Sequence, residues 1–249
     1  MAGDTAVEMS FMWCDAGPRL ESVPRSYGKL GHKVQRFAAA LAIAGLAFGW
    51  IAHAASAAER TIKLVALGDS LTAGYQLHGK AAFPVQLERA LKAKGHAVEV
   101  INAGVSGDTT SGGLARLDWS VPKDTDVVIL ELGANDMLRG IDPKIPREAL
   151  GEIVRRLKAR NIEVLLCGMW AAPNLGPDYV RAFDPIYPEL AAANDLVFYP
   201  FFLDGVVNDP KLHIGDGLHP NGEGVAKIVA GILPKVEAVL ARVRAKPAS

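Results

Sequence analysis

The sequence predicts an α/β domain with a parallel β-sheet and helices on both of its faces. Two observations predict this fold class. Five short apolar runs, most of them dense in Val, Ile and Leu, have the composition of strands buried on both faces. Between them lie segments whose apolar residues recur at helical spacing. Strands that alternate with helices form parallel sheets with right-handed crossover connections.

Four of the five strand candidates end at a glycine or at a short polar segment that contains one. Residues 62–67 run into Gly68, and residues 98–101 run into Asn102-Ala103-Gly104. Small and turn-forming residues of this kind stop a strand and begin a loop. The predicted strands are residues 62–67, 98–101, 127–132, 162–168 and 196–201.

Helices are expected between these strands and at the carboxyl end of the chain. The clearest is the last, where Val225, Ile228, Val229 and Ile232 begin a stripe on one helical face. The segment 178–193 is less regular, because its two prolines disturb the helical hydrogen bonds. The predicted helices are residues 83–94, 109–118, 146–160, 178–193 and the C-terminal segment from Val225 to Val243.

The first fifty-eight residues read as a leader, and residues 59–249 as the domain. Residues 37–52 are an uncharged run that follows a basic segment and precedes a segment of small residues containing Ala-Ser-Ala. This is the pattern of a secretory signal peptide, and it lies within residues 29–58. Cleavage is expected between Ala54 and Glu59, which predicts a periplasmic or secreted protein without stable membrane insertion. The alternative is an uncleaved anchor, although the run is shorter than the ~20 residues that span a bilayer.

Composition excludes several functional classes. Half of the 249 residues are hydrophobic and 22% are charged, which excludes a disordered chain. The 27 Lys and Arg residues balance the 27 Asp and Glu residues, so no basic excess predicts binding to nucleic acid. Cys14 and Cys167 are too few for a disulfide framework or a cysteine-rich zinc site. The oligomeric state does not follow from the sequence.

Polar residues with catalytic chemistry follow the first three strands and precede the last helix. Gly68-Asp69-Ser70 follows the first strand, and Gly104 follows the second. Asn135 follows the third strand, and the segment from Asp216 to His219 precedes the last helix. Because the carboxyl ends of parallel strands meet at one edge of the sheet, these groups are expected to converge on one crevice.

Together these residues can perform nucleophilic catalysis. A serine hydroxyl needs a base to remove its proton, and His219 is the natural base for Ser70, with Asp216 holding its other ring nitrogen. The backbone N–H groups of Ser70 and Gly104 and the side-chain amide of Asn135 can stabilise an oxyanion. Taken singly, Ser70 and Gly104 could be turn residues, and Asn135 or Asp216 could cap a helix.

The order and spacing of these motifs resemble the four blocks of the SGNH (GDSL-type) hydrolases, and the resemblance covers residues 62–240. Within this family the sequence most resembles the bacterial arylesterase, acyl-CoA thioesterase and lysophospholipase branch. The matching runs are residues 66–75, 102–110, 113–119, 130–136, 187–190 and 200–203.

The resemblance implies a three-layer α/β/α sandwich, similar to flavodoxin, with five parallel strands. It implies Ser70 as the nucleophile, His219 as the base and Asp216 as its orienting carboxylate. It also implies an oxyanion hole made by Ser70, Gly104 and Asn135. No cofactor and no metal are implied, and the partner is a small ester substrate.

One position departs from this branch. After the fourth strand the branch often carries an arginine before Leu-Pro or Ala-Pro, whereas this chain has Trp170. A large apolar ring in place of a cation favours an aryl or neutral ester over an anionic leaving group such as coenzyme A. The alternative is that Trp170 packs against the neighbouring helix.

The expected function is therefore a serine esterase acting on aryl or short-to-medium acyl esters, with thioesters and lysophospholipids as further candidates. A carbohydrate O-acetylesterase is an alternative, because the same four blocks serve that chemistry. A metal-dependent phosphoesterase is an alternative from another class, and EDTA resistance would dismiss it. A flavodoxin-type nucleotide-binding module is a third, but no Gly-rich phosphate loop is present.

Overall fold

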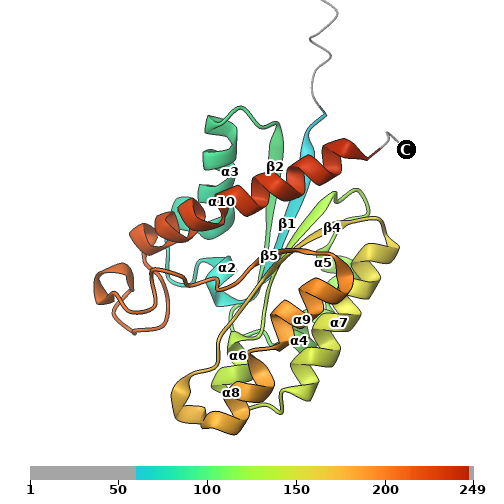
Figure 1. The fold of residues 1–249 in the computed structure, drawn as a ribbon. Helices are drawn as coiled ribbons and strands as arrows, with labels where there is room; N and C mark the ends of the chain where they lie inside the picture. The colour runs from blue at the N-terminus through green and yellow to red at the C-terminus, as the bar shows by residue number, and fades with distance from the viewer. Residues whose placement is uncertain (1–59, 247–249) are drawn as a thin grey trace, which may run out of the picture. The chain divides into compact units, whose positions relative to one another are not determined.

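The sheet has five strands, all parallel, in the order β2-β1-β3-β4-β5 (Figure 1). The structure is a computed structural model that describes residues 60–246, and these lie in the unit Glu59–Ser249. The leader predicted for residues 1–58 lies outside the described residues, as does its cleavage site. The strands are β1 Ile62–Gly68, β2 Val98–Gly104, β3 Val127–Glu131, β4 Glu163–Cys167 and β5 Val197–Tyr199.

Helices cover both faces of the sheet, so the predicted three-layer α/β/α sandwich is confirmed. Helices α3 and α10 cover one face, and α4, α7 and α9 cover the other (Figure 1). The α-helices are α2 Ser70–Ala73, α3 Phe83–Ala93, α4 Thr110–Ala115, α5 Leu117–Ser120, α6 Ala134–Leu138, α7 Lys144–Ala159, α8 Pro177–Phe183, α9 Ile186–Asn194 and α10 Gly222–Ala245. Short 3₁₀ turns are η1 Gly79–Ala81, η2 Pro173–Leu175 and η3 Pro210–Leu212.

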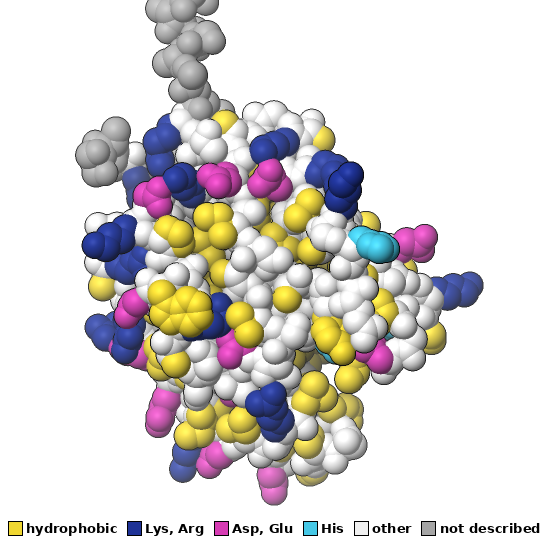
Figure 2. All heavy atoms as spheres, turned by 180° about the vertical axis from the view of Figure 1, so that it is seen from behind, with side chains coloured by type: hydrophobic (Ala, Val, Ile, Leu, Met, Phe, Trp, Pro, Cys, Tyr) yellow, Lys and Arg dark blue, Asp and Glu magenta, His cyan; other side chains and the backbone are white. Residues whose placement is uncertain are grey.

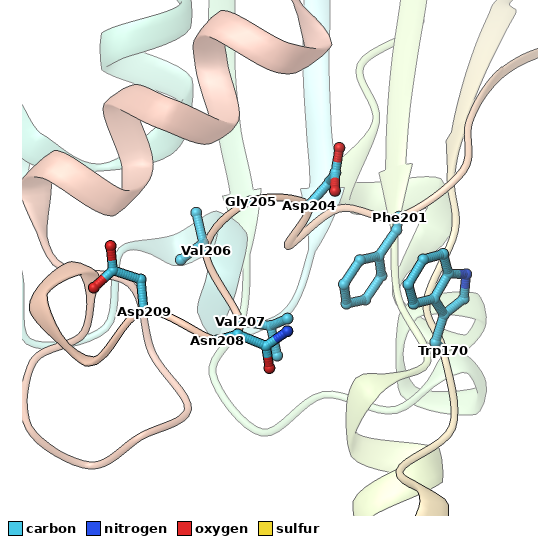
Figure 3. Close-up of a pocket in the computed structure, with 8 residues that line it drawn as sticks. All are labelled: Trp170, Phe201, Asp204, Gly205, Val206, Val207, Asn208 and Asp209. Carbon is cyan, nitrogen blue, oxygen red and sulfur yellow. The ribbon is translucent and has the colours of Figure 1, made fainter.

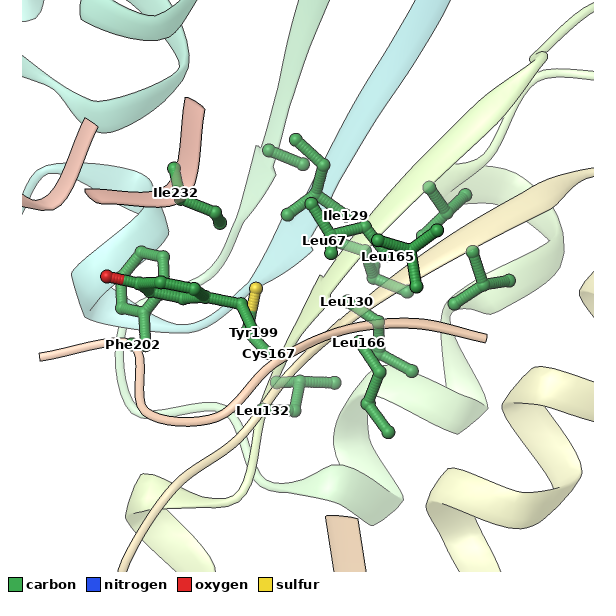
Figure 4. Packing of buried hydrophobic residues seen from close by; sticks show 14 of the residues in the cluster. Leu67, Ile129, Leu130, Leu132, Leu165, Leu166, Cys167, Tyr199, Phe202 and Ile232 are labelled. Atoms are coloured by element: carbon green, nitrogen blue, oxygen red, sulfur yellow. The ribbon is translucent and has the colours of Figure 1, made fainter. Parts of the chain in front are cut away.

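The core lies on both sides of the central strands. All five residues of β3 are buried, and β4 is buried at every residue but its first. Figure 4 shows these strands packing against Phe202 and Ile232, which reach the core from the loop after β5 and from α10. Strands that are buried on both faces need a continuous apolar composition, and for this reason they could be predicted from the sequence.

Two expected helices are interrupted in the structure. The segment 178–193 forms α8 and α9, because Pro185 cannot donate a helical hydrogen bond and begins a new helix as its cap. The segment 109–118 likewise divides into α4 and α5 at Arg116. Helices α2 and α6 were not predicted, because four or five residues are too few to show a helical period.

The register aligns the carboxyl ends of the three central strands. Gly68 at the end of β1 pairs with Gly104 on one side and with Glu131 on the other. The loops that follow these three residues therefore leave the sheet side by side. On the face shown in Figure 2, basic and acidic side chains are interspersed and form no large patch of one sign. Among the described residues no helix is both long and apolar enough to cross a membrane.

Candidate active site

Ser70 stands at the first position of α2, immediately beyond the end of β1. Asp69 caps this short helix, because its Oδ1 accepts the N–H of Leu71 at 2.9 Å. Gly74 ends the helix at a φ of 82° and donates its N–H to the Ser70 carbonyl. The N–H of Ser70 forms no hydrogen bond with any described residue. The turn therefore presents both the hydroxyl and the N–H of Ser70 to the crevice.

The structure brings Ser70, His219 and Asp216 together in one hydrogen-bonded chain. His219 Nε2 lies 2.9 Å from Ser70 Oγ, and His219 Nδ1 lies 2.6 Å from Asp216 Oδ2. The two residues of the loop are only partly covered, with 20% of the His219 side chain and 35% of the Asp216 side chain exposed. A substrate can therefore reach the imidazole and the hydroxyl together.

Asp216 is held as a carboxylate by its own loop. Burial raises its pKa, but the N–H groups of His219 and Leu218 and the His219 ring outweigh this effect and hold the pKa at about 2. Both N–H groups bind Oδ1 at 2.9 Å, which leaves Oδ2 for the ring. One side chain thus shapes the turn and orients the imidazole.

The loop that carries His219 is fastened to the start of α10. The Asn221 side chain caps that helix by accepting the N–H groups of Glu223 and Gly224. Its amide also donates to the Lys211 carbonyl at 2.7 Å and to the His213 carbonyl at 3.3 Å. His213 is buried where it forms an isolated antiparallel bridge with Pro220.

Of the predicted oxyanion donors, Asn135 binds Asp69, the residue before Ser70, and the Gly104 N–H is engaged elsewhere. Asn135, on α6, donates one amide N–H to Asp69 Oδ2 at 3.0 Å. Its second amide hydrogen forms no bond with a described residue. The N–H of Gly104 instead donates to the side chain of Asn102 at 2.9 Å. Gly104 is therefore not a free donor in this structure.

Gly104 has a packing function that sequence reasoning did not assign. A Cβ at this position would lie 2.3 Å from the Ala73 nitrogen and 2.9 Å from the Asp69 carbonyl oxygen. Only glycine lets β2 approach the serine turn so closely. Three residues later, Gly107 has a φ of 83°, and its N–H forms no hydrogen bond with a described residue. Gly107 is thus the free glycine donor of the same loop.

Arg116 joins the first two loops, and sequence reasoning missed it. Its guanidinium donates to the Gly68 carbonyl at 2.9 Å and the Ala103 carbonyl at 2.8 Å. Asp108 pairs with it at 2.6 Å, and only 6% of Arg116 is exposed. A buried charge is tolerated only with partners of this kind. The signal was its place in the run 113–119, which matched the family without indicating a role.

Aromatic side chains lie beside His219 and beyond the carboxyl ends of β4 and β5. The ring of Tyr75 lies 4.6 Å from that of His219, as measured between ring centroids. Trp170 is 53% exposed and stacks on Phe201 at 4.2 Å with an interplanar angle of 4°, so it does not pack under a helix. Phe83 is fully buried against Phe202.

Trp170 and Phe201 line a hollow of about 240 Å³ at the ends of β4 and β5 (Figure 3). Its remaining walls come from the loop 204–209, which leads on toward Asp216. Asp204 and Asp209 line the hollow, and no Lys or Arg among residues 60–246 does. Within residues 60–246, no three His, Cys, Asp or Glu side chains are grouped so that they could hold a metal ion.

Comparison with known proteins agrees with this geometry. Residues 66–227 match the GDSL-like lipase/acylhydrolase family. The chain is 41% identical to an arylesterase of Vibrio mimicus over 184 residues, which are 72% of this chain and 92% of that protein. It is also 41% identical to the thioesterase 1/protease 1/lysophospholipase L1 of Escherichia coli K12 over 159 residues, 64% of this chain and 75% of that protein.

A solved structure shows the same likeness in three dimensions. The SGNH-hydrolase family esterase AlinE4 superposes with a TM-score of 0.61 at 43% identity, covering 73% of this chain and 97% of that one. The sheet order, the Ser70–His219–Asp216 contacts and these likenesses agree, and the chain belongs to the GDSL/SGNH family of hydrolases.

Proposed function

We propose that this chain is a serine esterase in which Ser70 attacks the ester, His219 is the base and Asp216 orients His219. The observation that carries the proposal is the hydrogen-bonded chain from Asp216 through the imidazole to Ser70, with contacts of 2.6 and 2.9 Å. Nucleophile, base and orienting carboxylate within hydrogen-bond reach are the requirement for this chemistry. Relatives that are named esterases support ester hydrolysis as the reaction.

The reaction proceeds in two halves. His219 Nε2 takes the Ser70 proton as Oγ bonds the carbonyl carbon, and the carbonyl oxygen becomes an oxyanion. Collapse of this intermediate breaks the ester C–O bond, and the leaving alcohol takes the proton from His219. Water then gives a proton to His219 and attacks the acyl-Ser70 carbonyl. The second collapse returns the proton to Ser70 and releases the acid.

The oxyanion is stabilised by donors that are already in place. We assign the Ser70 N–H and the second amide N–H of Asn135, both of which lack partners among the described residues. Gly107 is a better third donor than Gly104, because the Gly104 N–H is bound to Asn102. Losing one such donor typically lowers kcat by about 10²–10³-fold.

Aryl esters and neutral esters of short-to-medium acids are the proposed substrates. The exposed Trp170 ring offers a stacking surface, and the carboxylates of Asp204 and Asp209 at the hollow disfavour anionic groups. A relative named arylesterase supports this choice. Thioesters and lysophospholipids are further candidates, because the Escherichia coli relative carries those activities in its name.

An acetylated sugar is the second candidate. An exposed indole beside the side chains of Asp204 and Asn208 could stack on a sugar face and bind its hydroxyls. Sugar acetates therefore belong in the substrate panel beside aryl acetates.

The first experiment is hydrolysis of p-nitrophenyl esters from acetyl to palmitoyl, with and without EDTA. We expect EDTA-resistant activity that Ser70→Ala abolishes while its circular dichroism stays that of the parent. Activity that survives in Ser70→Ala would refute the mechanism, and activity lost to EDTA would favour a metal-dependent phosphoesterase or another metal enzyme.

The substrate proposal has a matched pair of variants. Trp170→Ala removes the ring at the hollow, whereas Trp119→Ala removes an indole that is 77% exposed on α5. We expect Trp170→Ala to raise KM for phenyl acetate more than for ethyl acetate, and Trp119→Ala to change neither. Equal effects of the two variants would show that Trp170 does not contact the substrate.

We further propose that residues 29–58 direct export and that cleavage falls between Ala54 and Glu59. The basic, apolar and small-residue segments of that stretch support this. Intact-mass measurement of the protein from a bacterial periplasmic fraction tests it. A mass that retains the apolar run would indicate an uncleaved anchor.

A further inference from the structure

Two buried acidic residues contact the turn that carries Ser70. Asp69 follows β1 and is 0% exposed, and Glu131 ends β3 and is 1% exposed. The register places Glu131 directly beside Gly68, the residue before Asp69. Neither carboxyl belongs to the hydrogen-bonded chain of Ser70, His219 and Asp216. A buried acid costs free energy unless its oxygens form hydrogen bonds. Their hydrogen bonds differ in a way that assigns them different roles.

Asp69 accepts hydrogen bonds at both oxygens. Oδ1 binds the N–H of Leu71 at 2.9 Å, and Oδ2 binds the Asn135 amide at 3.0 Å. Only an ionised carboxylate accepts equally well at both positions, since a protonated acid or an amide has a donor at one of them. The contact also fixes which way the Asn135 amide faces, with its nitrogen toward Asp69. The other N–H of that nitrogen is left for the oxyanion.

Glu131 is satisfied at one oxygen only. Its Oε2 accepts the Thr72 hydroxyl at 2.7 Å and, more weakly, the Asp69 N–H at 3.4 Å. Its Oε1 is buried and has no hydrogen-bond partner among the described residues. An ionised carboxylate in this position would hold a buried charge without a cation or a full set of donors. The contacts therefore favour the neutral acid.

The electrostatics of the pair point the same way. Burial, and then the Asp69 charge, raise the pKa of Glu131 well above its ordinary value. Burial also raises the pKa of Asp69, but hydrogen bonds from Leu71 and Asn135 and the charge of His219 limit the rise to about 6. The Asp108 carboxylate acts on Asp69 in the opposite sense to His219. Both effects favour a proton on Glu131 over a proton on Asp69, because two like charges on interacting carboxyl groups disfavour ionisation of both.

We propose that Asp69 and Glu131 are positioning residues with opposite charge states: ionised Asp69 orients the Asn135 amide toward the oxyanion, and neutral Glu131 supports the turn through Thr72. The proposal rests on the esterase mechanism above and adds two residues to it. It predicts opposite outcomes for the same kind of substitution, because an amide mimics a neutral acid and cannot mimic a double acceptor.

Asp69→Asn and Glu131→Gln test this directly. In Asp69→Asn the new NH₂ faces the Asn135 amide, which turns and presents its oxygen to the oxyanion. We expect kcat to fall about 10²–10³-fold with little change in KM, the loss expected for one oxyanion donor. Glu131→Gln is expected to keep kcat within a fewfold of the parent.

Asp136→Asn is the matched control. Asp136 is also 0% exposed and also accepts at both oxygens, from the N–H and the hydroxyl of Thr110. Among the described residues it forms no hydrogen bond with the Asn135 amide. We expect it to lower the melting temperature with a much smaller loss of kcat than Asp69→Asn. Equal kcat losses in the two variants would show that Asp69 acts only through stability.

A double-mutant cycle distinguishes positioning of the Asn135 amide from a general loss of active-site structure. If Asp69 acts through Asn135, then Asp69→Asn lowers kcat in the parent but adds little in an Asn135→Ala background. Additive losses would overturn the proposal. Ser70→Ala is measured in parallel, because activity in that variant would refute the esterase mechanism itself rather than the roles of Asp69 and Glu131.

The proton on Glu131 has a readout that needs no activity. Infrared difference spectra of the parent against Glu131→Gln near neutral pH are expected to show the band of one protonated carboxylic acid, present only in the parent. If that band is missing in the parent, Glu131 is ionised and the proposal is wrong. This measurement on the parent stands even where a variant does not fold.

Discussion

Asp216 combines two roles in one side chain, and an isosteric change can separate them. Asp216→Asn keeps an oxygen for the N–H groups of Leu218 and His219 but gives the His219 ring an amide in place of a carboxylate. We expect kcat to fall about 10³–10⁴-fold with the melting temperature nearly unchanged, because the wrong imidazole tautomer faces Ser70. The measurement is kcat for p-nitrophenyl acetate together with thermal unfolding.

Asp142→Asn provides the comparison for that prediction. Asp142 also accepts a backbone N–H two residues on, from Lys144, and it lies outside the Ser70–His219–Asp216 contacts. A similar kcat loss in both variants would argue against an orienting role for Asp216. Because the Asp216 pKa is about 2, the acid limb of the parent's pH profile is not expected to come from this carboxylate.

The raised pKa of Glu131 makes a prediction about stability. Between its unfolded and folded pKa values the native state binds more protons than the unfolded state, so Glu131 lowers stability as the pH rises through that window. Glu131→Gln removes this loss. We expect its melting temperature to exceed the parent's by a few degrees near pH 8, at roughly 2–4 °C per kcal/mol, and the excess to vanish near pH 4. An excess that is the same at both pH values would contradict the assignment.

At the residue scale the sequence predicted chemistry better than contacts. Ser70, Asp216 and His219 could be chosen because each residue type has a known role and each follows a predicted strand or precedes the last helix. The role of Arg116 could not be predicted, because it donates hydrogen bonds to carbonyls that lie 48 and 13 residues away in sequence and that only the fold brings to it. Gly104 was predicted to be an oxyanion donor, but its N–H binds the Asn102 side chain two residues away. Its close approach to Ala73 is a tertiary contact that only the fold shows.

At the scale of elements, the predicted strands and long helices agree with the structure to within about three residues at each end. Buried parallel strands are continuous apolar runs, so β1 and β3 were visible without any alternation. The short helices α2 and α6, which carry Ser70 and Asn135, were not visible. They form because caps and neighbouring loops hold them, as Asp69 does for α2, and not because of a periodic pattern.

The packing of β2 against α2 predicts contrasting effects for two Gly→Ala substitutions. Gly104→Ala would force a Cβ into backbone atoms of Ala73 and Asp69, so we expect a loss of about 1–3 kcal/mol in the free energy of unfolding and a lower kcat. Gly151→Ala lies within α7 with no atom within 4 Å of the new Cβ. It is expected to stabilise by roughly 0.5–1 kcal/mol with kcat unchanged.

Urea unfolding of the two variants, with kcat measured on the same samples, checks this pair. Both changes add one methyl group, so a difference in sign reports the local space and not the chemistry. If Gly104→Ala is as stable and active as the parent, then the serine turn can yield to β2. The close approach would then have no part in holding Ser70.

At the scale of the whole molecule, the parallel sheet gathers four separate loops at one edge. Ser70 and His219 are 149 residues apart in sequence, yet they lie within hydrogen-bond distance, and Asn135 binds Asp69 next to Ser70. This happens because β1 and β3 end side by side and the loop before α10 reaches the same edge. That convergence was predictable from strand order rules alone. The hollow beside Trp170 could not be predicted from the sequence, because its walls depend on how the loop 204–209 folds after β5.

The unit Glu59–Ser249 is predicted to fold and to work without the segment before it. Every strand of the sheet and every residue of the described core lies between Ile62 and Val243, and the Ser70–His219–Asp216 contacts lie within the same span. A domain of this size buries enough apolar surface to be stable by itself. Residues 59–249 expressed alone should therefore unfold in one cooperative transition by circular dichroism and by tryptophan fluorescence. Their kcat/KM for p-nitrophenyl acetate should lie within about twofold of that of the full chain. Non-coincident transitions, or activity that appears only with residues 1–58 attached, would show that the leader segment contributes to the folded enzyme.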